Sequence, residues 1–280
     1  MSLLKVIVLG IVQGLTEFLP VSSSGHLVVA GALLNVNSPG VLLEVSLHFG
    51  TLLAILVVFR RDLVELVQAG WNGTKLLLAG RHSELRTEAP GFYTCVALAV
   101  GTVPAAVAGT TLENYIKPLF RGNLAACGGF LVLTGLLLAS SRYAKRGRAS
   151  SVGPAKGLGV GVAQALALFP GISRSGVTIT AGLHLNLERE TAARFAFLLA
   201  VPALLGAQGW ELLDGTGSGL SETAWLTLTA GTITSAAVGV GALLVLMPLV
   251  RRGKLHLFAW YCIPAGLVTT SLGLMGWGAG

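Results

Sequence analysis

Two polar interruptions inside long apolar sequence restrict most strongly how this chain of 280 residues can fold. The first break is Gln13-Gly-Leu-Thr-Glu-Phe-Leu-Pro-Val-Ser-Ser-Ser-Gly-His26, and the second break is Pro170-Gly-Ile-Ser-Arg-Ser-Gly176. Each places proline, glycine, serine and ionisable side chains between apolar segments. An ionisable residue at membrane depth costs about 2.5–3.5 kcal/mol on insertion scales, so both breaks are candidate functional sites.

The composition indicates a protein that crosses a membrane several times. Hydrophobic residues make up 53% of the chain and charged residues only 11%, against about a quarter charged in soluble domains. The net charge of +7 comes from Lys and Arg in short loops, which is how basic residues set membrane orientation, so no nucleic-acid partner is expected. The three cysteines lie far apart in candidate spans, which argues against a disulfide framework or a cysteine metal motif.

Six apolar runs approach the roughly 20 residues that a helix needs to cross the bilayer. They cover about residues 43–60, 91–111, 122–141, 190–209, 222–249 and 256–276. The segments 2–34 and 155–186 each contain two shorter apolar pieces around a break, which predicts re-entrant helix–loop–helix pairs buried in protein or lining a cavity. The stretch 62–89 mixes charged and apolar residues and is expected at the membrane interface. The prediction is an all-α integral membrane protein with six transmembrane helices and two re-entrant pairs.

The two halves of the chain resemble each other. Aligning Pro20 with Pro170 superimposes the two breaks and their serine clusters. Each half then contains one re-entrant pair and three spans, and because three is odd the second half starts from the opposite side of the membrane. The prediction is one membrane domain, 1–280, built as an inverted-topology repeat of about 1–145 and about 152–280. Chance similarity between Leu- and Ala-rich helices is the alternative.

Basic residues are concentrated on one side of the predicted spans. That side receives Arg60, Arg61, Lys75, Arg81, Arg86, Arg142, Lys145, Arg146, Arg148, Lys156, Arg189, Arg251, Arg252 and Lys254. The other side receives Lys5, Lys117 and Arg121, plus a loop near 210–222 with Glu211, Asp214 and Glu222. The positive-inside rule places the basic side in the cytoplasm, so both termini are expected outside and the first re-entrant pair is expected to enter from outside.

The first break carries several groups that could act on a substrate. It offers the carboxylate of Glu17, the amide of Gln13, the imidazole of His26 and the hydroxyls of Ser22, Ser23 and Ser24. Gln13 and Glu17 are four residues apart, so they share one face of a helix. Gly25 would let the backbone turn closely around a ligand. Either Ser23, activated by His26, or His26 itself is a candidate nucleophile.

The second break places Arg174 between Ser173 and Ser175, with Thr178 shortly after. The planar guanidinium fork suits phosphate oxygens. If the repeat brings the breaks together, an acid, hydroxyls, a base or nucleophile and an anion clamp would share one site, as phosphoryl chemistry requires. Alternatively, Glu17 and Arg174 could form a structural ion pair and the serines could cap helix ends. Roles remain open for His48, His184, Arg194 and Glu44.

Both breaks resemble the signatures of the undecaprenyl-diphosphate phosphatases, the bacitracin-resistance family of bacterial inner membranes. The stretch from Gln13 to His26 is similar to the first signature, and the stretch from Pro170 to Gly176 is similar to the second. The phrase Glu188-Arg-Glu-Thr-Ala-Ala-Arg-Phe195 is similar to the sequence that follows in the family. Length, span pattern and order agree, so the resemblance covers nearly the whole chain.

The resemblance implies hydrolysis of the terminal phosphate of undecaprenyl diphosphate to undecaprenyl phosphate and inorganic phosphate. This reaction recycles the cell-wall lipid carrier and confers bacitracin resistance. The resemblance also implies a site on the outer, periplasmic side and a divalent cation, Mg²⁺ or Ca²⁺. By position, Glu17 matches the second acidic residue of the first motif, and Gln13 stands where many members have Glu. The other matching polar positions are Ser23, His26, Ser173 and Arg174.

The resulting hypothesis assigns each residue a role. The catalytic residues are Glu17, Ser23, His26 and Arg174; the substrate-binding residues are Gln13, Ser22, Ser24, Gly25, Ser173, Ser175 and Thr178; the metal ligands are Glu17 and Gln13. The competing hypothesis is a polyprenyl-phosphate transporter or flippase, because inverted repeats with broken helices are typical of transporters. Glycine-rich spans such as 127–135 permit close helix contacts, either within the chain or in a homodimer.

Overall fold

The computed structural model describes residues 2–34, 36, 41–112, 115, 123–145, 147–213 and 222–276. Lys117, Arg121, Arg146 and Asp214, which entered the orientation argument, lie outside the described residues. The described part is helical, with a single isolated bridge between Ala149 and Leu187. The all-α prediction is therefore confirmed for this part of the chain.

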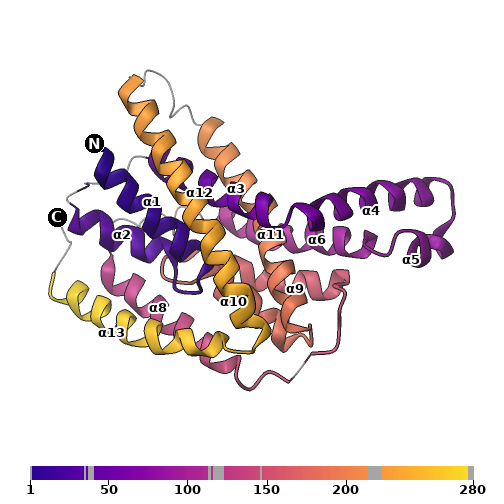
Figure 1. The fold of residues 1–280 in the computed structure, drawn as a ribbon. Coiled ribbons are helices and arrows are strands. Elements are labelled where there is room, and N and C mark those ends of the chain that lie inside the picture. Colours follow the sequence, from indigo (N-terminus) through magenta and orange to yellow (C-terminus); the bar gives the residue numbers. More distant parts are fainter. Residues whose placement is uncertain are drawn as a thin grey trace.

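Twelve α-helices form the described part of the fold (Figure 1). They are α1 (Leu3–Phe18), α2 (Ser23–Leu33), α3 (Val41–Val58), α4 (Arg60–Leu78), α5 (Leu85–Glu88), α6 (Phe92–Thr111), α8 (Leu124–Ser140), α9 (Pro154–Leu166), α10 (Arg174–His184), α11 (Arg189–Leu213), α12 (Glu222–Arg251) and α13 (Ala259–Leu274). Short 3₁₀ segments, His82–Glu84 and Leu255–Phe258, precede α5 and α13.

Four described helices are long and apolar enough to cross a membrane. They are Phe92–Thr111, Arg189–Gly209, Trp225–Arg251 and Leu255–Leu274, and they correspond to four of the six predicted spans. The predicted span 43–60 is α3, which continues into α4 through a bend of 77°, so that the pair counts as a fifth span only when taken together. The predicted span 122–141 is α8, which is apolar but has only 17 residues.

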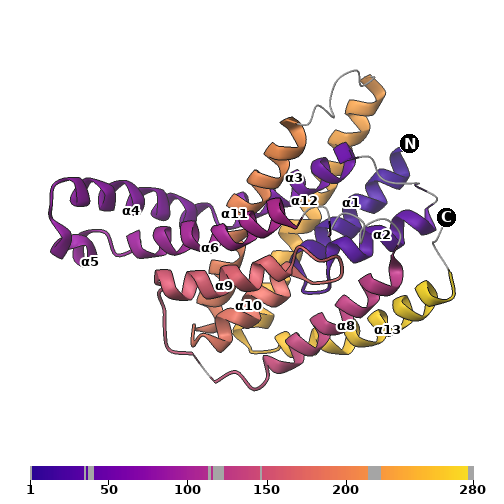
Figure 2. The ribbon, with the colours of Figure 1, turned by 180° about the vertical axis from the view of Figure 1, so that it is seen from behind.

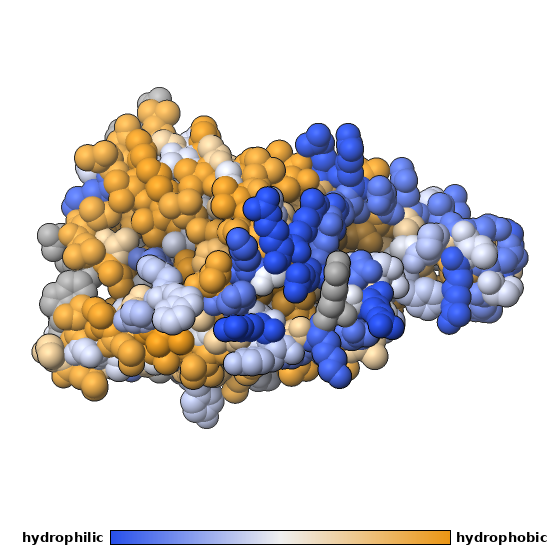
Figure 3. Space-filling view, turned by 60° about the horizontal axis from the view of Figure 1, so that its bottom comes forward, coloured by the Kyte–Doolittle hydropathy of each residue, from blue (hydrophilic) through white to orange (hydrophobic). Residues whose placement is uncertain are grey.

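Hydrophilic side chains are concentrated on one part of the molecule. The space-filling view shows a broad apolar body and a hydrophilic region that continues onto the projecting end formed by α4 and α5 (Figures 1 and 3). For the segment 62–89 the sequence predicted an interfacial segment and a loop. In the structure most of this segment is helical, and it projects from the body together with the start of α6.

Each break connects two helices that are too short to cross a bilayer. The first pair, α1 and α2, has 16 and 11 residues, and the second pair, α9 and α10, has 13 and 11 residues. The first loop turns at Ser22, whose φ is +69°, and the second loop turns at Gly171, whose φ is +102°. A Cβ atom at Gly171 would lie 2.2 Å from the carbonyl oxygen of Cys127, so only glycine fits there. The helix–loop–helix form of both segments is confirmed.

Small residues bring the helices of the two halves into close contact. Helix α1 packs on α12, and reciprocally α9 packs on α6. A Cβ atom at Gly14 would lie 2.6 Å from the carbonyl oxygen of Ser235, and one at Gly161 would lie 2.1 Å from that of Gly101. Such contacts require small residues, as in membrane helix pairs generally.

The glycine-rich segment 127–135 is used within the chain. Helices α8 and α13 run side by side along one edge of the molecule (Figures 1 and 2). A Cβ atom at Gly128 would lie 2.4 Å from the backbone nitrogen of Thr270, and one at Gly135 would lie 2.5 Å from Ile263 Cγ1. These glycines therefore fix α13 against α8.

Candidate functional site

The two breaks meet in the interior of the molecule. Arg174, the first residue of α10, donates a hydrogen bond of 2.9 Å to Glu17 in the last turn of α1. The backbone N–H of Gly171 points to Ser24 Oγ at 3.5 Å. The first turns of α2 and α10 thus lie at one junction. Because helix N-termini carry unpaired N–H groups and a partial positive charge, this junction suits an anion.

Glu17 is the centre of the junction. Its side chain is only 6% exposed, and its Oε1 accepts the hydrogen bond from Arg174. Its Oε2 accepts hydrogen bonds from Ser23 Oγ at 2.5 Å and from Gln13 Nε2 at 3.0 Å. His48 Nε2 lies 3.7 Å from the same oxygen, so His48 belongs to the cluster. Four elements, α1, α2, α3 and α10, supply these side chains.

The predicted pairing of Ser23 with His26 is wrong. Ser23 starts α2 and its hydroxyl points back across the loop to Glu17, at the end of α1. His26 Nδ1 lies 2.7 Å from the carbonyl oxygen of Ser22, and His26 Nε2 lies 2.6 Å from the hydroxyl of Tyr261. The group that accepts the hydrogen bond of the Ser23 hydroxyl is therefore a carboxylate, not the imidazole.

Ser22, not Gly25, turns the first loop. Ser22 is buried with a left-handed φ of +69°, and such non-glycine conformations cost about 1–3 kcal/mol and cluster at functional sites. Gly25 lies inside α2, where a Cβ atom would be 3.2 Å from Cys127 Sγ. Its small size lets α2 approach α8. The hydroxyls of Ser22 and Ser24 lie 3.3 Å apart, with Ser24 facing the second loop.

The hydroxyls of the second break organise the start of α10. Ser173 Oγ accepts a hydrogen bond of 3.2 Å from the backbone N–H of Gly176, so the helix-capping alternative is confirmed for Ser173. Ser175 Oγ lies 3.2 Å from Ser173 Oγ, and Thr178 Oγ1 donates to the carbonyl oxygen of Arg174 at 2.7 Å. The substrate-binding roles of these hydroxyls stay predictions.

Two residues that the sequence did not single out hold the breaks in place. Thr134 of α8 is 1% exposed, donates a hydrogen bond of 2.9 Å to the carbonyl of Gly171, and accepts one of 3.1 Å from the N–H of Ser173. Tyr261 of α13 bonds His26. Both lie in apolar helices, where no local pattern distinguishes them from their neighbours.

Replacing Thr134 with valine should destabilise the protein. Valine keeps the shape but leaves a buried N–H and a buried carbonyl of the second loop without their partner. An unsatisfied buried group costs about 1–3 kcal/mol, so thermal unfolding in detergent should occur at a lower temperature. The matched control is Thr269→Val, because Thr269 bonds the carbonyl of Ala265 in its own helix. Equal stability of both variants would contradict this role of Thr134.

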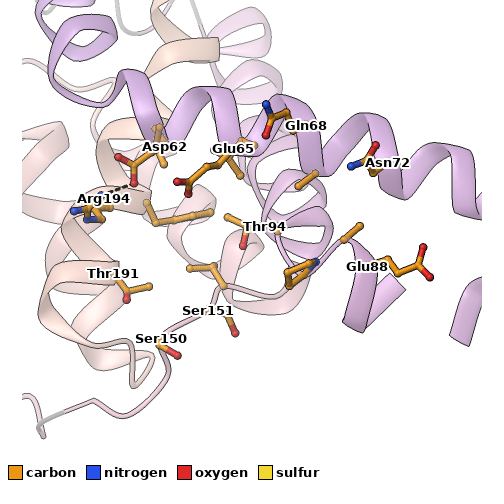
Figure 4. A pocket seen from close by; sticks show the side chains of 18 residues that line it. Asp62, Glu65, Gln68, Asn72, Glu88, Thr94, Ser150, Ser151, Thr191 and Arg194 are labelled. Carbon is orange, nitrogen blue, oxygen red and sulfur yellow. Dashed lines mark hydrogen bonds and ion pairs between the residues drawn. The ribbon is translucent and has the colours of Figure 1, made fainter. Parts of the chain in front are cut away.

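A second region gathers charges away from the two breaks. A cavity of about 500 Å³ lies between α4, α11 and residues 150–152 (Figure 4). Asp62, Glu65 and Glu88 line it, together with Arg194, which is held by Asp62 at 2.5 Å. Because carboxylates repel a diphosphate, this cavity does not suit such a ligand.

His184, whose role the sequence left open, lies on the surface, where its Nε2 is 3.0 Å from the hydroxyl of Ser140.

The cavity at the junction of the breaks is small and amphipathic. It holds about 10 Å³, close to the volume that one water molecule needs. Glu17, Arg174 and Ser175 line its polar side, and Phe18, Ile55, Ala196, Phe197 and Ala200 line its apolar side. Phe18 packs edge-on against Phe197 with ring centroids 5.8 Å apart. Charge and hydrocarbon surface therefore meet at this point.

Gln13 and Glu17 fit a hard cation that also binds phosphate. No group of three or more His, Cys, Asp or Glu side chains within the described ranges could hold a metal ion. Gln13 Oε1 is buried and has no hydrogen-bond partner among the described residues, and it lies on the amide that bonds Glu17. Carboxylate and amide oxygens suit Mg²⁺ and Ca²⁺, and Mg²⁺ is commonly held by one or two carboxylates plus substrate phosphates.

Comparisons with known proteins show the family of this chain. The family model described as "Bacitracin resistance protein BacA" matches residues 6–268. The chain is 43% identical over 270 residues to an undecaprenyl-diphosphatase of Desulfosudis oleivorans, covering 96% of this chain and 97% of that one. It is 42% identical over 268 residues to the undecaprenyl-diphosphatase of Geobacter sulfurreducens, covering 95% and 96%. It is 38% identical over 272 residues to that of Korarchaeum cryptofilum, covering 97% and 100%. This chain belongs to the bacitracin resistance protein BacA family.

Proposed function

We propose that this protein hydrolyses undecaprenyl diphosphate to undecaprenyl phosphate and inorganic phosphate. The observation that carries the proposal is the contact of Glu17 with Ser23 and Arg174, which joins the two breaks at two helix N-termini. Family membership supports the same reaction, since the relatives are undecaprenyl-diphosphatases. Removal of the terminal phosphate recycles the lipid carrier, in agreement with the bacitracin resistance in the family's name.

Arg174 and the helix N-termini bind the diphosphate. The guanidinium exchanges Glu17 for phosphate oxygens, and the N–H groups of the first turn of α10 lie beside it. The backbone N–H groups are fixed before the substrate arrives, so they stabilise charge that develops on the transferring phosphoryl group. The apolar wall with Phe18 and Phe197 receives the start of the polyprenyl chain. The lining of the cavity is thus amphipathic, as the substrate is.

Ser23 is the nucleophile and Glu17 is its base. Ser23 Oγ attacks the terminal phosphorus and gives its proton to Glu17 Oε2, which lies 2.5 Å away. The bond from phosphorus to the bridging oxygen breaks, and undecaprenyl phosphate leaves. Water then attacks the phosphoserine, one water proton goes to solvent, the bond from phosphorus to Ser23 Oγ breaks, and Glu17 returns its proton to Ser23. His26, bonded to Tyr261, is the competing nucleophile.

Gln13 Oε1 and Glu17 would hold a divalent cation in this reaction. The chemistry that a bound cation would supply is positive charge beside the phosphate groups. Gln13 supplies a neutral oxygen, so the pair contributes a single negative charge. With one carboxylate in place of two, this pair would bind a cation more weakly in the absence of the substrate's phosphates.

The proposed membrane setting has six spans, two re-entrant pairs and both termini outside. The reciprocal packing of α1 on α12 and of α9 on α6 supports an inverted repeat, because a twofold axis exchanges such partners. The described basic side chains support the orientation through the positive-inside rule. The site then opens to the outer, periplasmic side of the bacterial inner membrane.

The same reciprocal packing favours a second candidate, a polyprenyl-phosphate transporter. Transporters place broken helices at the interface of inverted repeats. A carrier needs the anion clamp of Arg174 but has no use for a hydroxyl held against a carboxylate. The short contact between Ser23 and Glu17 therefore favours the hydrolase.

Purified protein in detergent should release inorganic phosphate from undecaprenyl diphosphate, and a chelator of divalent cations should suppress the release. An acid quench should trap phosphoserine at Ser23. Sealed spheroplasts should hydrolyse substrate that is added outside without permeabilisation, because the site opens outward. Lipid movement in liposomes without phosphate release would reject the hydrolase, and a phosphate trapped on His26 would reject Ser23 as nucleophile.

A further inference from the structure

Tyr261 connects the last helix of the chain to the first break. Its hydroxyl lies 2.6 Å from His26 Nε2, although 235 residues separate the two in sequence. The two rings also stack, with centroids 5.7 Å apart and planes inclined by 22°. The Tyr261 side chain is thus in contact with the imidazole through both its ring and its hydroxyl.

The two hydrogen bonds of His26 fix its tautomer. Nδ1 lies 2.7 Å from the carbonyl oxygen of Ser22, and a carbonyl can only accept. Nδ1 must therefore carry the proton. In the neutral ring, Nε2 then has a lone pair and accepts hydrogen bonds. The hydroxyl of Tyr261 can donate to that lone pair. The contacts with Ser22 and Tyr261 together fix the plane of the imidazole ring and make Nε2 its basic nitrogen.

Helix α13 is held firmly enough to fix the tyrosine. Cys262, the next residue, donates from Sγ to the carbonyl of Pro20 at 3.4 Å. The close approach of Gly135 to Ile263 holds the same turn against α8. Two consecutive residues of α13 therefore contact the first break, one at Pro20 and one at His26. The tyrosine ring is half-exposed, but its hydroxyl is directed to the imidazole.

We propose that Tyr261 is a positioning residue for His26 and acts on the chemical step, not on substrate affinity. The proposal rests on the proposed phosphatase function: Ser23 and His26 lie about one turn apart in α2, so the imidazole is close to the phosphorus that Ser23 attacks. Tyr261 keeps the Nε2 lone pair of His26 in one direction, as the outer hydrogen-bond partners of metal-ligating histidines do for those rings. Without the hydroxyl, the ring keeps its bond to Ser22 but loses its second fixed point.

The test compares Tyr261→Phe with the wild type and with Tyr93→Phe, a control in α6 whose ring packs on Phe92. Phenylalanine keeps the stacking, so the variant should fold. Its kcat should fall about 10- to 100-fold, the range found when a metal-ligating histidine loses its outer hydrogen-bond partner, while KM stays unchanged. Tyr93→Phe should behave as the wild type.

A second measurement does not depend on catalysis. With ¹⁵N-labelled histidine, and His26→Asn to assign the signal, Nε2 of His26 should be unprotonated and hydrogen-bonded in the wild type and should shift in Tyr261→Phe. Unchanged kcat, or a raised KM with unchanged kcat, overturns the positioning role, and an unchanged Nε2 signal overturns the contact itself. Absence of hydrolysis by the wild type would reject the phosphatase proposal, while the Nε2 signal would still test the contact.

Discussion

Replacing Arg174 with alanine should lower the rate of phosphate release by about 10³–10⁵, the range found for arginines that stabilise phosphoryl transfer. The guanidinium is the cationic side chain of the second break that reaches Glu17, and its planar fork matches phosphate oxygens. The loss should appear mainly in kcat, because charge on the phosphoryl group develops in the transition state. Steady-state phosphate release in detergent measures it.

The controls for Arg174 separate chemistry from folding. Alanine leaves the buried Glu17 carboxylate without its ion pair, which itself destabilises. Arg174→Lys keeps the charge and should fold, yet it lacks the fork and should still be strongly impaired. Arg81→Ala removes a surface arginine that bonds Glu84 and Glu88, and it should leave the rate unchanged. Wild-type activity in Arg174→Lys would contradict the bidentate role.

Replacing Glu17 with glutamine should reduce kcat by about 10²–10⁴, the usual contribution of general acid–base catalysis. The amide has nearly the shape of the carboxylate, but it cannot take the proton of Ser23. It also loses the charge that faces Arg174. The concentration of Mg²⁺ needed for half-maximal activity should rise, because the remaining oxygens at the site are neutral.

A matched control for Glu17 exists in the charged group on α11. Glu190 accepts hydrogen bonds from Arg194 at 3.0 Å and from Arg251 at 2.6 Å. Glu190→Gln removes a carboxylate that, like Glu17, is held by arginine but belongs to neither break, so its kcat should match the wild type. Similar losses in both variants would show that Glu17 acts through stability alone.

Local sequence predicted the elements that surround the candidate site. Pro20 and Pro170 interrupt apolar sequence, and both segments form short helix pairs. Glu17 and Arg174 were predicted to share a site from the repeat, and the structure places them in contact. This prediction was possible because a polar side chain inside apolar sequence has few hydrogen-bond or charge partners other than another polar residue.

Contacts that depend on tertiary position were not predictable. Thr134 and Tyr261 reach the breaks from helices far away in sequence, and a single Thr or Tyr in an apolar helix carries no periodic signal. Ser23 and His26 are three residues apart, so the sequence suggested a pair. The four-residue loop instead brings the end of α1 opposite the start of α2, which gives Ser23 to Glu17. Turn geometry, set by Ser22 in a left-handed conformation, decided this partner.

The salt bridge at the junction has a consequence for inhibitors. Glu17 already forms an ion pair with the guanidinium of Arg174, so its carboxylate competes within the molecule with any anion that binds there. A ligand binds only the fraction of molecules in which Arg174 has released Glu17, and its apparent affinity falls by that fraction. Free monoanions should therefore bind weakly, and compounds that combine a dianionic head group with an apolar tail should be the effective inhibitors.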